Sequence, residues 1–282
     1  MLSSVGAQYT ATYLPDTAPD KTGQGTNKCG TTSSQDSMCQ NIYINAADDF
    51  CLWAPPISGL DSTIGATECI EVSWYLKSGY RTRVIPEGTI TGIHFVLTPD
   101  FVQIAGSGDL TKLNIPAGNE GGELDPHGAD GNGNPIGGLL FSSAFGKTQQ
   151  MFEWTVSTRN FMAATDFCFR ACNPAGEHIY DLMGCAWNVP ANYDAGVFKS
   201  CNGDSGEPMG VYGTLTFHQG EASTPAPHPV LSSSQCTTFS AIGGGAATMS
   251  VTITMTSTSA SVHLFTLLSS SRTNLCSLGL LQ

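Results

Sequence analysis

Short runs of β-branched and aromatic residues, several of them alternating with polar positions, recur along the chain between Gly, Pro, Asn and Asp residues. Alternation with a period of two predicts strands that bury one face. We expect strands over 68–76, 90–97, 110–115, 138–141, 152–156 and 209–217. Helical periodicity is scarce and predicts only two short helices, over 45–51 and 160–167. The pattern predicts a mainly β fold, a sandwich or a barrel with long loops.

The cysteines predict how this fold is held together. There are ten, none of them in a C-x-x-C pair or clustered with His, which argues against structural zinc. An even number at loose spacing is typical of a disulfide framework formed in an oxidising compartment, although the sequence does not give the pairing. Buried free thiols are the alternative. The disulfide candidates are Cys29, Cys39, Cys51, Cys69, Cys168, Cys172, Cys185, Cys201 and Cys236, and Cys276 is the tenth cysteine.

Three regions differ in composition. Residues 1–28 are a polar lead-in, whose first residues (MLSSVGA) lack the charge and the apolar stretch of a complete secretion signal, so we expect the remnant of one. Residues 29–219 form the predicted disulfide-rich β domain. Residues 220–282 are rich in Ser, Thr and Pro and are predicted to be a disordered linker or stalk. Because N-x-Ser/Thr is absent from the chain, any glycans there would be O-linked.

Charge excludes two classes of partner. Eleven Lys and Arg stand against twenty-three Asp and Glu, which gives a net charge of −12. A nucleic-acid binder gains affinity by neutralising phosphates, and an anionic membrane surface attracts basic segments, so neither partner fits. No apolar run approaches the length of a membrane span. The 40% hydrophobic content is enough for a sizeable core.

One segment resembles the nucleophile region of trypsin-like serine proteases. Residues 201–208 read CNGDSGEP, where those enzymes have GDSGGP, and Ser205 would be the nucleophile. Such a serine needs a histidine base oriented by a buried aspartate. Glu207 replaces a glycine, and neither His94 nor His127 has the sequence context of that base. We therefore expect a plain turn after a disulfide-bonded cysteine.

A second segment resembles part of a calcium-binding loop. Within 121–138, oxygen-bearing residues stand at alternate positions, which lets them surround one hard cation. It is not an EF-hand, because Pro135 replaces the required Gly and Phe141 replaces the last Glu, although Glu123 and His127 just upstream could complete another kind of site. The alternative is a loop whose side chains cap their own backbone. The candidate ligands for Ca²⁺ are Asp125, Asp130, Asn132 and Asn134.

Acid–base chemistry and aromatic stacking have weaker signals. A glycosidase needs two carboxyl groups across a sugar-sized cleft, and sequence adjacency does not show that. The pairs are Asp48 with Asp49, Asp125 with Asp130, and Glu177 with Asp181, the last near His178 and Tyr180. Aromatic rings could stack on sugars, although Trp usually packs in a core. The tryptophans are Trp53, Trp74, Trp154 and Trp187.

Long stretches resemble one known family. They are residues 27–56, 71–138, 160–172 and 178–198, and the resemblance extends over 26–238. The family comprises secreted glycoproteins of mushroom-forming fungi, called macrophage-activating glycoproteins. The resemblance implies an exported, cysteine-rich fungal protein, and it supplies no catalytic residues. This chain has Tyr75 where the family has Cys, which implies that Cys69 replaces a lost disulfide partner.

These observations lead to one preferred function and two alternatives. We expect a secreted, non-catalytic fungal glycoprotein of the cell wall or extracellular matrix that binds polysaccharide or another wall component. The first alternative is a metal-assisted polysaccharide hydrolase or lyase that uses the acidic loop 123–134. The second is a self-assembling extracellular protein, suggested by the alternating apolar and hydroxyl residues of 249–255.

Overall fold

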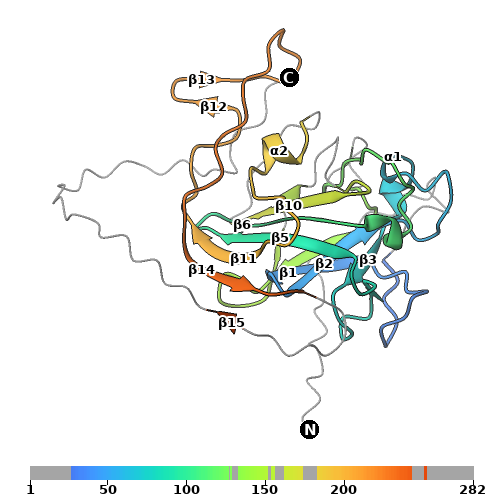
Figure 1. The fold of residues 1–282 in the computed structure, drawn as a ribbon. Helices are drawn as coiled ribbons and strands as arrows, with labels where there is room; N and C mark the ends of the chain where they lie inside the picture. The colour runs from blue at the N-terminus through green and yellow to red at the C-terminus, as the bar shows by residue number, and fades with distance from the viewer. Residues whose placement is uncertain are drawn as a thin grey trace.

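The computed structural model describes residues 27–126, 128, 133–151, 154–155, 162–173, 183–242 and 251–252. Most of its regular structure belongs to two mixed sheets (Figure 1). The six-stranded sheet has the order β4 (Arg83–Val84), β3 (Val72–Tyr75), β2 (Asp49–Ala54), β1 (Asn41–Ala46), β7 (Leu139–Ser142) and β8 (Gln149–Met151). The seven-stranded sheet has the order β15 (Val251–Thr252), β14 (Ser233–Phe239), β11 (Phe198–Gly203), β5 (Ile90–Leu97), β6 (Phe101–Gly108), β10 (Asp166–Cys172) and β9 (Trp154–Thr155).

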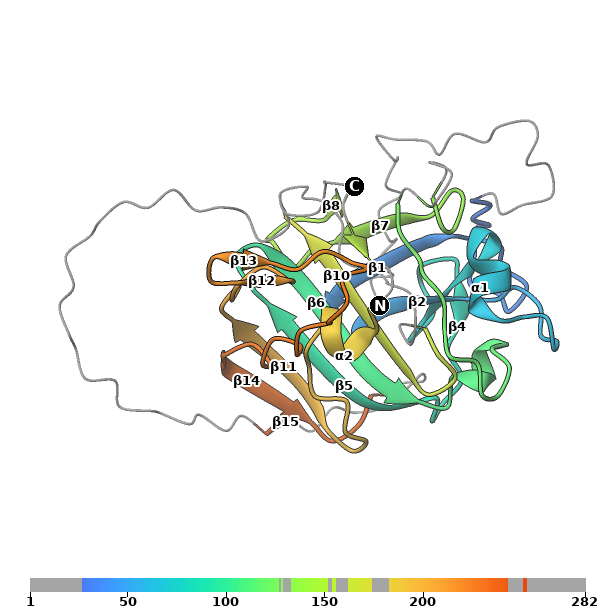
Figure 2. The same ribbon diagram turned by 90° about the horizontal axis from the view of Figure 1, so that it is seen from above.

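The remaining elements are short. Strands β12 (Val211–Tyr212) and β13 (Leu215–Thr216) form a small hairpin, and the helical turns are α1 (Ile64–Thr67), η2 (Glu68–Ile70), η3 (Leu110–Leu113) and α2 (Cys185–Asn188). In the part of the chain that the structure describes, no helix is long and apolar enough to cross a membrane. Figure 2 shows α2 lying over the face of the seven-stranded sheet.

The two sheets pack face to face and enclose the main core. The ring of Phe50 on β2 stacks on Phe167 of β10, with centroids 5.8 Å apart, and Phe169 lies 6.1 Å from the ring of Trp53. Because side chains alternate along a strand, Cys168 and Arg170 point to the opposite face of the seven-stranded sheet. The expected mainly β sandwich is confirmed.

Three disulfides pair described cysteines, namely Cys29 with Cys39, Cys168 with Cys185, and Cys201 with Cys236. Cys172 is also disulfide-bonded. The Cys69 thiol donates a hydrogen bond to Asn134 Oδ1 at 3.4 Å. Cys51 differs from the expectation, because it is a free thiol buried in the core on β2. Cys276 lies outside the described residues.

Several local expectations were wrong because contacts between distant segments override local propensity. Residues 45–51, expected to be helical, belong to the hairpin of β1 and β2. The described part of the predicted helix 160–167 enters β10, and residues 110–113 of a predicted strand form η3. The predicted strand 209–217 is instead the β12–β13 hairpin. The strand over 90–97 matches β5, and 138–141 overlaps β7.

The predicted linker region also contains sheet strands. Ser233–Phe239 forms β14, which pairs with β11 in antiparallel register, Lys199 opposite Thr238. The Cys201–Cys236 disulfide ties the same two strands together. Within 249–255, Val251–Thr252 forms β15 and pairs with β14. The β domain therefore extends past the expected boundary at residue 219.

Candidate functional site

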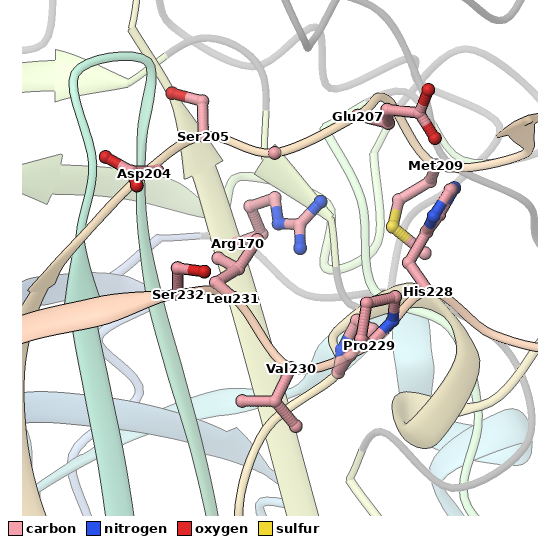
Figure 3. A pocket seen from close by; sticks show the side chains of 12 residues that line it. Arg170, Asp204, Ser205, Glu207, Met209, His228, Pro229, Val230, Leu231 and Ser232 are labelled. Carbon is pink, nitrogen blue, oxygen red and sulfur yellow. The ribbon is translucent and has the colours of Figure 1, made fainter. Parts of the chain in front are cut away.

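A pocket of about 210 Å³ lies on the outer face of the seven-stranded sheet. Its lining comes from Arg170 on β10, from Pro190, and from the segments 204–207, 209 and 228–232 (Figure 3). All three of the segments 204–207, 209 and 228–232 lie between Cys201 and Cys236, so one disulfide closes the loop that contains these wall segments. The pocket is smaller than the roughly 300–1,000 Å³ that encloses a drug-sized ligand.

Arg170 is the charged group at the base of this pocket. It is only 6% exposed, and its side chain reaches from the strand into the middle of the lining residues (Figure 3). Its guanidinium lies 4.2 Å from the centre of the Phe101 ring, a cation–π contact. It also lies beside Gln103, which stands directly opposite Arg170 in the β6–β10 pairing.

Gln103 holds the guanidinium in one orientation. Its carboxamide oxygen accepts a hydrogen bond from Nε at 3.1 Å and another from Nη2 at 2.6 Å. The Gln103 amide nitrogen donates to the carbonyl oxygen of Pro190 at 3.3 Å, which fixes the direction of the carboxamide. Of the five N–H donors of the guanidinium, those on the Nη1–Nη2 edge are left for another acceptor.

Arg170 keeps its charge although it is buried. Burial lowers its pKa to about 10, so the guanidinium is protonated at neutral pH. Within the described ranges, no carboxylate lies within ion-pair distance of it. The acidic side chains of the pocket, Asp204 and Glu207, are exposed at its rim. A buried cation without a counter-charge is costly, which makes the pocket receptive to an acceptor group from outside.

A histidine forms another wall of the pocket. The ring of His228 stacks on Tyr212, with centroids 4.5 Å apart and planes inclined by 13°. His228 Nε2 is buried and has no hydrogen-bond partner in the described part of the chain. Tyr212 is held in turn by a hydrogen bond from its hydroxyl to the carbonyl oxygen of Ala226 at 2.5 Å. His228 therefore contributes a ring that is held by stacking on Tyr212 to the pocket wall.

The protease-like segment has a structural role in this pocket. The Ser205 hydroxyl donates to Asp100 Oδ2 at 2.5 Å and points away from Arg170 (Figure 3). Glu207 accepts a hydrogen bond from the backbone N–H of Gly213 at 3.3 Å. His94 is buried on β5 and accepts a hydrogen bond from the backbone of Asn192. Ser205 is thus anchored to a carboxylate rather than presented to a histidine base.

The predicted calcium ligands are only partly described. Asp125 and Asn134 are buried and face each other in an antiparallel bridge, with backbone hydrogen bonds of 2.9 and 2.8 Å. Asp125 Oδ1 also accepts a hydrogen bond from the backbone of Gly128 at 2.6 Å. Asp130, Asn132 and His127 lie outside the described residues. Among the residues described, no three His, Cys, Asp or Glu side chains form a group that could hold a metal ion, and the calcium site stays a prediction.

Those of the other sequence candidates that the structure describes do not form a surface site. All four tryptophans are buried, so their rings pack in the interior and offer no exposed platform for sugars. Of the paired acids, Asp49 accepts a hydrogen bond from the Tyr75 hydroxyl, which packs beside it. Glu177, His178, Tyr180 and Asp181 lie outside the described residues.

Sequence reasoning missed the residues at the base of the pocket. Arg170 stands alone in an apolar strand sequence, DFCFRAC, in a chain with only eleven Lys and Arg. A charged residue within such an apolar run could have indicated the site, because a buried arginine needs a partner. Gln103 and Pro190 carried no comparable signal, since their roles depend on contacts between distant segments.

The fold and the pocket define a disulfide-bonded β-sandwich protein with a buried cation on its outer face. The chain is 50% identical over 255 residues to "Appressorium protein ROW2" of Mycosarcoma maydis. The aligned region covers 86% of each of the two chains. It is 49% identical over 231 residues to "Appressorium protein ROW1" of the same fungus, across 78% of this chain and 53% of ROW1. The chain belongs to this family of fungal appressorium proteins.

The chain therefore spans about half the length of ROW1 and most of ROW2. No family model matches it, and no solved structure is similar to it. The fungal relatives agree with the fungal origin that the sequence resemblance implied, although neither carries the macrophage-activating name. Several disulfides in one chain are typical of proteins made in the oxidising secretory compartment.

Proposed function

We propose that this protein is a secreted, non-catalytic fungal protein that binds a cell-wall polysaccharide in the Arg170 pocket. The observation that carries the proposal is the buried guanidinium, which is fixed by Gln103 and lacks a counter-charge among the described residues. Preorganised polar groups in a small concave site are the usual means of orienting a ligand. The names of the two relatives point to the appressorium as the setting.

The composition of the pocket supports a saccharide. Sugars present many hydroxyl groups, and the rim carboxylates of Asp204 and Glu207 can accept hydrogen bonds from them. Leu231 and Pro229 add apolar surface against which the C–H groups of a sugar ring can pack. A volume of about 210 Å³ suits one ring, with the rest of the polymer outside the pocket.

The experiment is depletion of the full-length protein from solution by insoluble polymers. The panel contains isolated fungal walls, β-glucan, chitin, cellulose and bead-coupled polyuronate. Val230 lines the pocket and is 49% exposed, so Val230→Trp should fill the entrance without disturbing the core. Leu60 is 93% exposed and does not line the pocket, which makes Leu60→Trp the matched control.

The proposal expects depletion by at least one polymer, lost in Val230→Trp and kept in Leu60→Trp. If no polymer depletes the wild-type protein, wall-polysaccharide binding is excluded. If Val230→Trp binds as well as the wild type, the pocket is not the binding site.

A further inference from the structure

We infer that the Arg170 pocket selects saccharides that carry a carboxylate, which makes an acidic sugar such as a uronate its ligand class. The inference rests on the proposed function and adds the chemical group that the pocket recognises. It follows from the geometry around the guanidinium, from the charges at the rim and from the size of the pocket.

The free edge of the guanidinium matches a carboxylate. Gln103 occupies the Nε–Nη2 edge with a single oxygen, which leaves the Nη1–Nη2 edge with paired N–H groups. Two parallel N–H groups on one edge form a bidentate pair with the two oxygens of a carboxylate. A neutral hydroxyl would use only one of these donors and would leave the charge of Arg170 uncompensated.

The charged residues of the pocket favour a ligand with one negative charge over a ligand with two. Arg170 is the only Lys or Arg among the lining residues, and it sits at the base. Asp204 and Glu207 lie at the rim and would repel additional negative charge on a ligand. A carboxylate brings one negative charge, whereas a phosphate monoester brings about −1.5 to −2 at neutral pH. The pocket therefore fits a carboxylate better than a phosphate.

The guanidinium is also held ready for such a partner. Gln103 is completely buried, and its amide nitrogen is fixed by the Pro190 carbonyl, so the orientation of Arg170 does not depend on the ligand. A group that is already oriented loses little conformational entropy on binding. Gln103 is thus a positioning residue for the ligand contact of Arg170.

The test compares a sugar acid with its uncharged ester. Full-length protein is titrated by calorimetry with galacturonate, with galacturonate methyl ester and with inorganic phosphate. The ester keeps the sugar ring and its hydroxyl groups and removes the charge, at the expense of one added methyl group. We expect the acid to bind roughly 10- to 100-fold more tightly than the ester, the range for a hydrogen bond to a charged group. Equal affinity for acid and ester would overturn the inference, as would tighter binding of phosphate than of galacturonate.

Two variants locate the effect. Arg170→Met should remove the preference for the acid, while Arg83→Met should keep it. Arg83 is the matched control, because it is equally buried at 6% exposure and makes a cation–π contact, with Trp74 at 5.2 Å, but does not line the pocket. A folded Arg170→Met that still prefers the acid would contradict the inference. Should that variant fail to fold, the comparison of acid and ester on the wild-type protein decides.

The results also separate this inference from the proposed function. Val230→Trp could abolish polymer depletion while the acid and the ester bind with equal affinity. In that case the proposed function holds and the inferred recognition of a carboxylate is rejected. If the acid is preferred but no polymer depletes the protein, the carboxylate site holds and the proposed polysaccharide binding is rejected.

Discussion

Gln103 and Arg170 face each other across strands β6 and β10, and one carboxamide oxygen of Gln103 accepts two hydrogen bonds from the Arg170 guanidinium. The pair lies on the face of the seven-stranded sheet that does not contact the other sheet. A neutral acceptor thus orients a buried positive charge without neutralising it. This arrangement differs from a structural ion pair, in which a carboxylate of the protein compensates the charge.

Replacing Gln103 by Glu should convert the site into an internal ion pair. The new carboxylate would lie within hydrogen-bond distance of Arg170 and would compete with an external anion. We expect affinity for galacturonate to fall at least about tenfold. The variant also loses the hydrogen bond to the Pro190 carbonyl oxygen, so thermal unfolding shows whether the new ion pair offsets this loss. Calorimetric titration and thermal unfolding measure the two effects, and unchanged affinity for the acid would contradict the assigned role of the pair.

Gln103→Met serves as the matched comparison. It removes the acceptor and leaves two N–H groups of a buried guanidinium without a partner, which should lower the free energy of unfolding by about 2–3 kcal/mol. Urea unfolding measures this loss. A loss below about 0.5 kcal/mol would show that Gln103 does not support Arg170.

Removing the Cys201–Cys236 disulfide should affect both stability and ligand binding. The bond closes a loop with a sequence separation of 35 residues that contains the pocket wall segments. Chain-entropy arguments give a loss of roughly 4 kcal/mol for Cys201→Ser with Cys236→Ser. Because β14 and the wall segments lose their tether, polymer depletion should also weaken.

Cys29→Ser with Cys39→Ser is the control pair. This disulfide spans a separation of 10 residues, for which the same argument gives roughly 3 kcal/mol, and neither cysteine lines the pocket. The control should lose stability and keep polymer binding. Equal loss of binding in both pairs would mean that the effect is one of general destabilisation.

Because Glu71 is buried, we expect the free energy of unfolding to fall as the pH rises. The side chain is fully buried, Oε1 accepts a hydrogen bond from the Thr67 hydroxyl at 2.5 Å, and Oε2 has no hydrogen-bond partner among the described residues. Burial raises the pKa of Glu71 well above its usual value, and the nearby Glu68 raises it further. The folded state therefore binds this proton more tightly than the unfolded state does.

The sign of the pH effect follows from that difference. Above the unfolded pKa of about 4.3, the free energy of unfolding should decrease with pH until the folded pKa of Glu71 is passed. Glu71→Gln should remove this decrease and stabilise the protein at neutral pH. Urea unfolding of both proteins between pH 4 and 8 provides the measurement, and a variant less stable than wild type at pH 8 would contradict the assignment.

Cys51 should behave as an inert thiol in the folded protein. It is completely buried on β2, and burial raises its pKa well above the usual range. Since the thiolate is the reactive form, iodoacetamide should leave the Cys51 peptide unmodified in native conditions and modify it after unfolding in guanidinium. Mass spectrometry of the digested protein shows the difference, and rapid native labelling would mean that this part of the core opens.

The sequence predicted those features that depend on local pattern. Strand β5 is a run rich in β-branched and aromatic residues, whose bounds were predicted without error, and the cysteine spacing indicated a disulfide framework. Residues 45–51, at the turn of the β1–β2 hairpin, were expected to be helical, because Asn45 can cap the start of a helix. The conformation of this segment is determined by pairing between strands, and a short stretch of sequence does not contain that information.

For the same reason, the pocket could not be predicted from local sequence patterns. Arg170 and Gln103 are 67 residues apart, and the wall segments near Ser205 and His228 are brought together by the pairing of β11 with β14 and by the Cys201–Cys236 disulfide. Residues 204–207 were noticed for their likeness to a protease and predicted to form a turn. Their contribution to the pocket depends on the register of β11 and β14, which the chain's local pattern does not specify.

The most direct test of ligand binding in this pocket is to follow the Arg170 side chain itself. The chain has five arginines, so the Nε–H signals of ¹⁵N-labelled protein are few and can be assigned with Arg170→Lys and Arg83→Lys. We expect soluble oligosaccharides released from the bound polymer to shift the Arg170 signal in a saturable way and to leave the Arg83 signal in place. Binding that shifts other signals and leaves Arg170 unchanged would contradict the assignment of the pocket as the binding site.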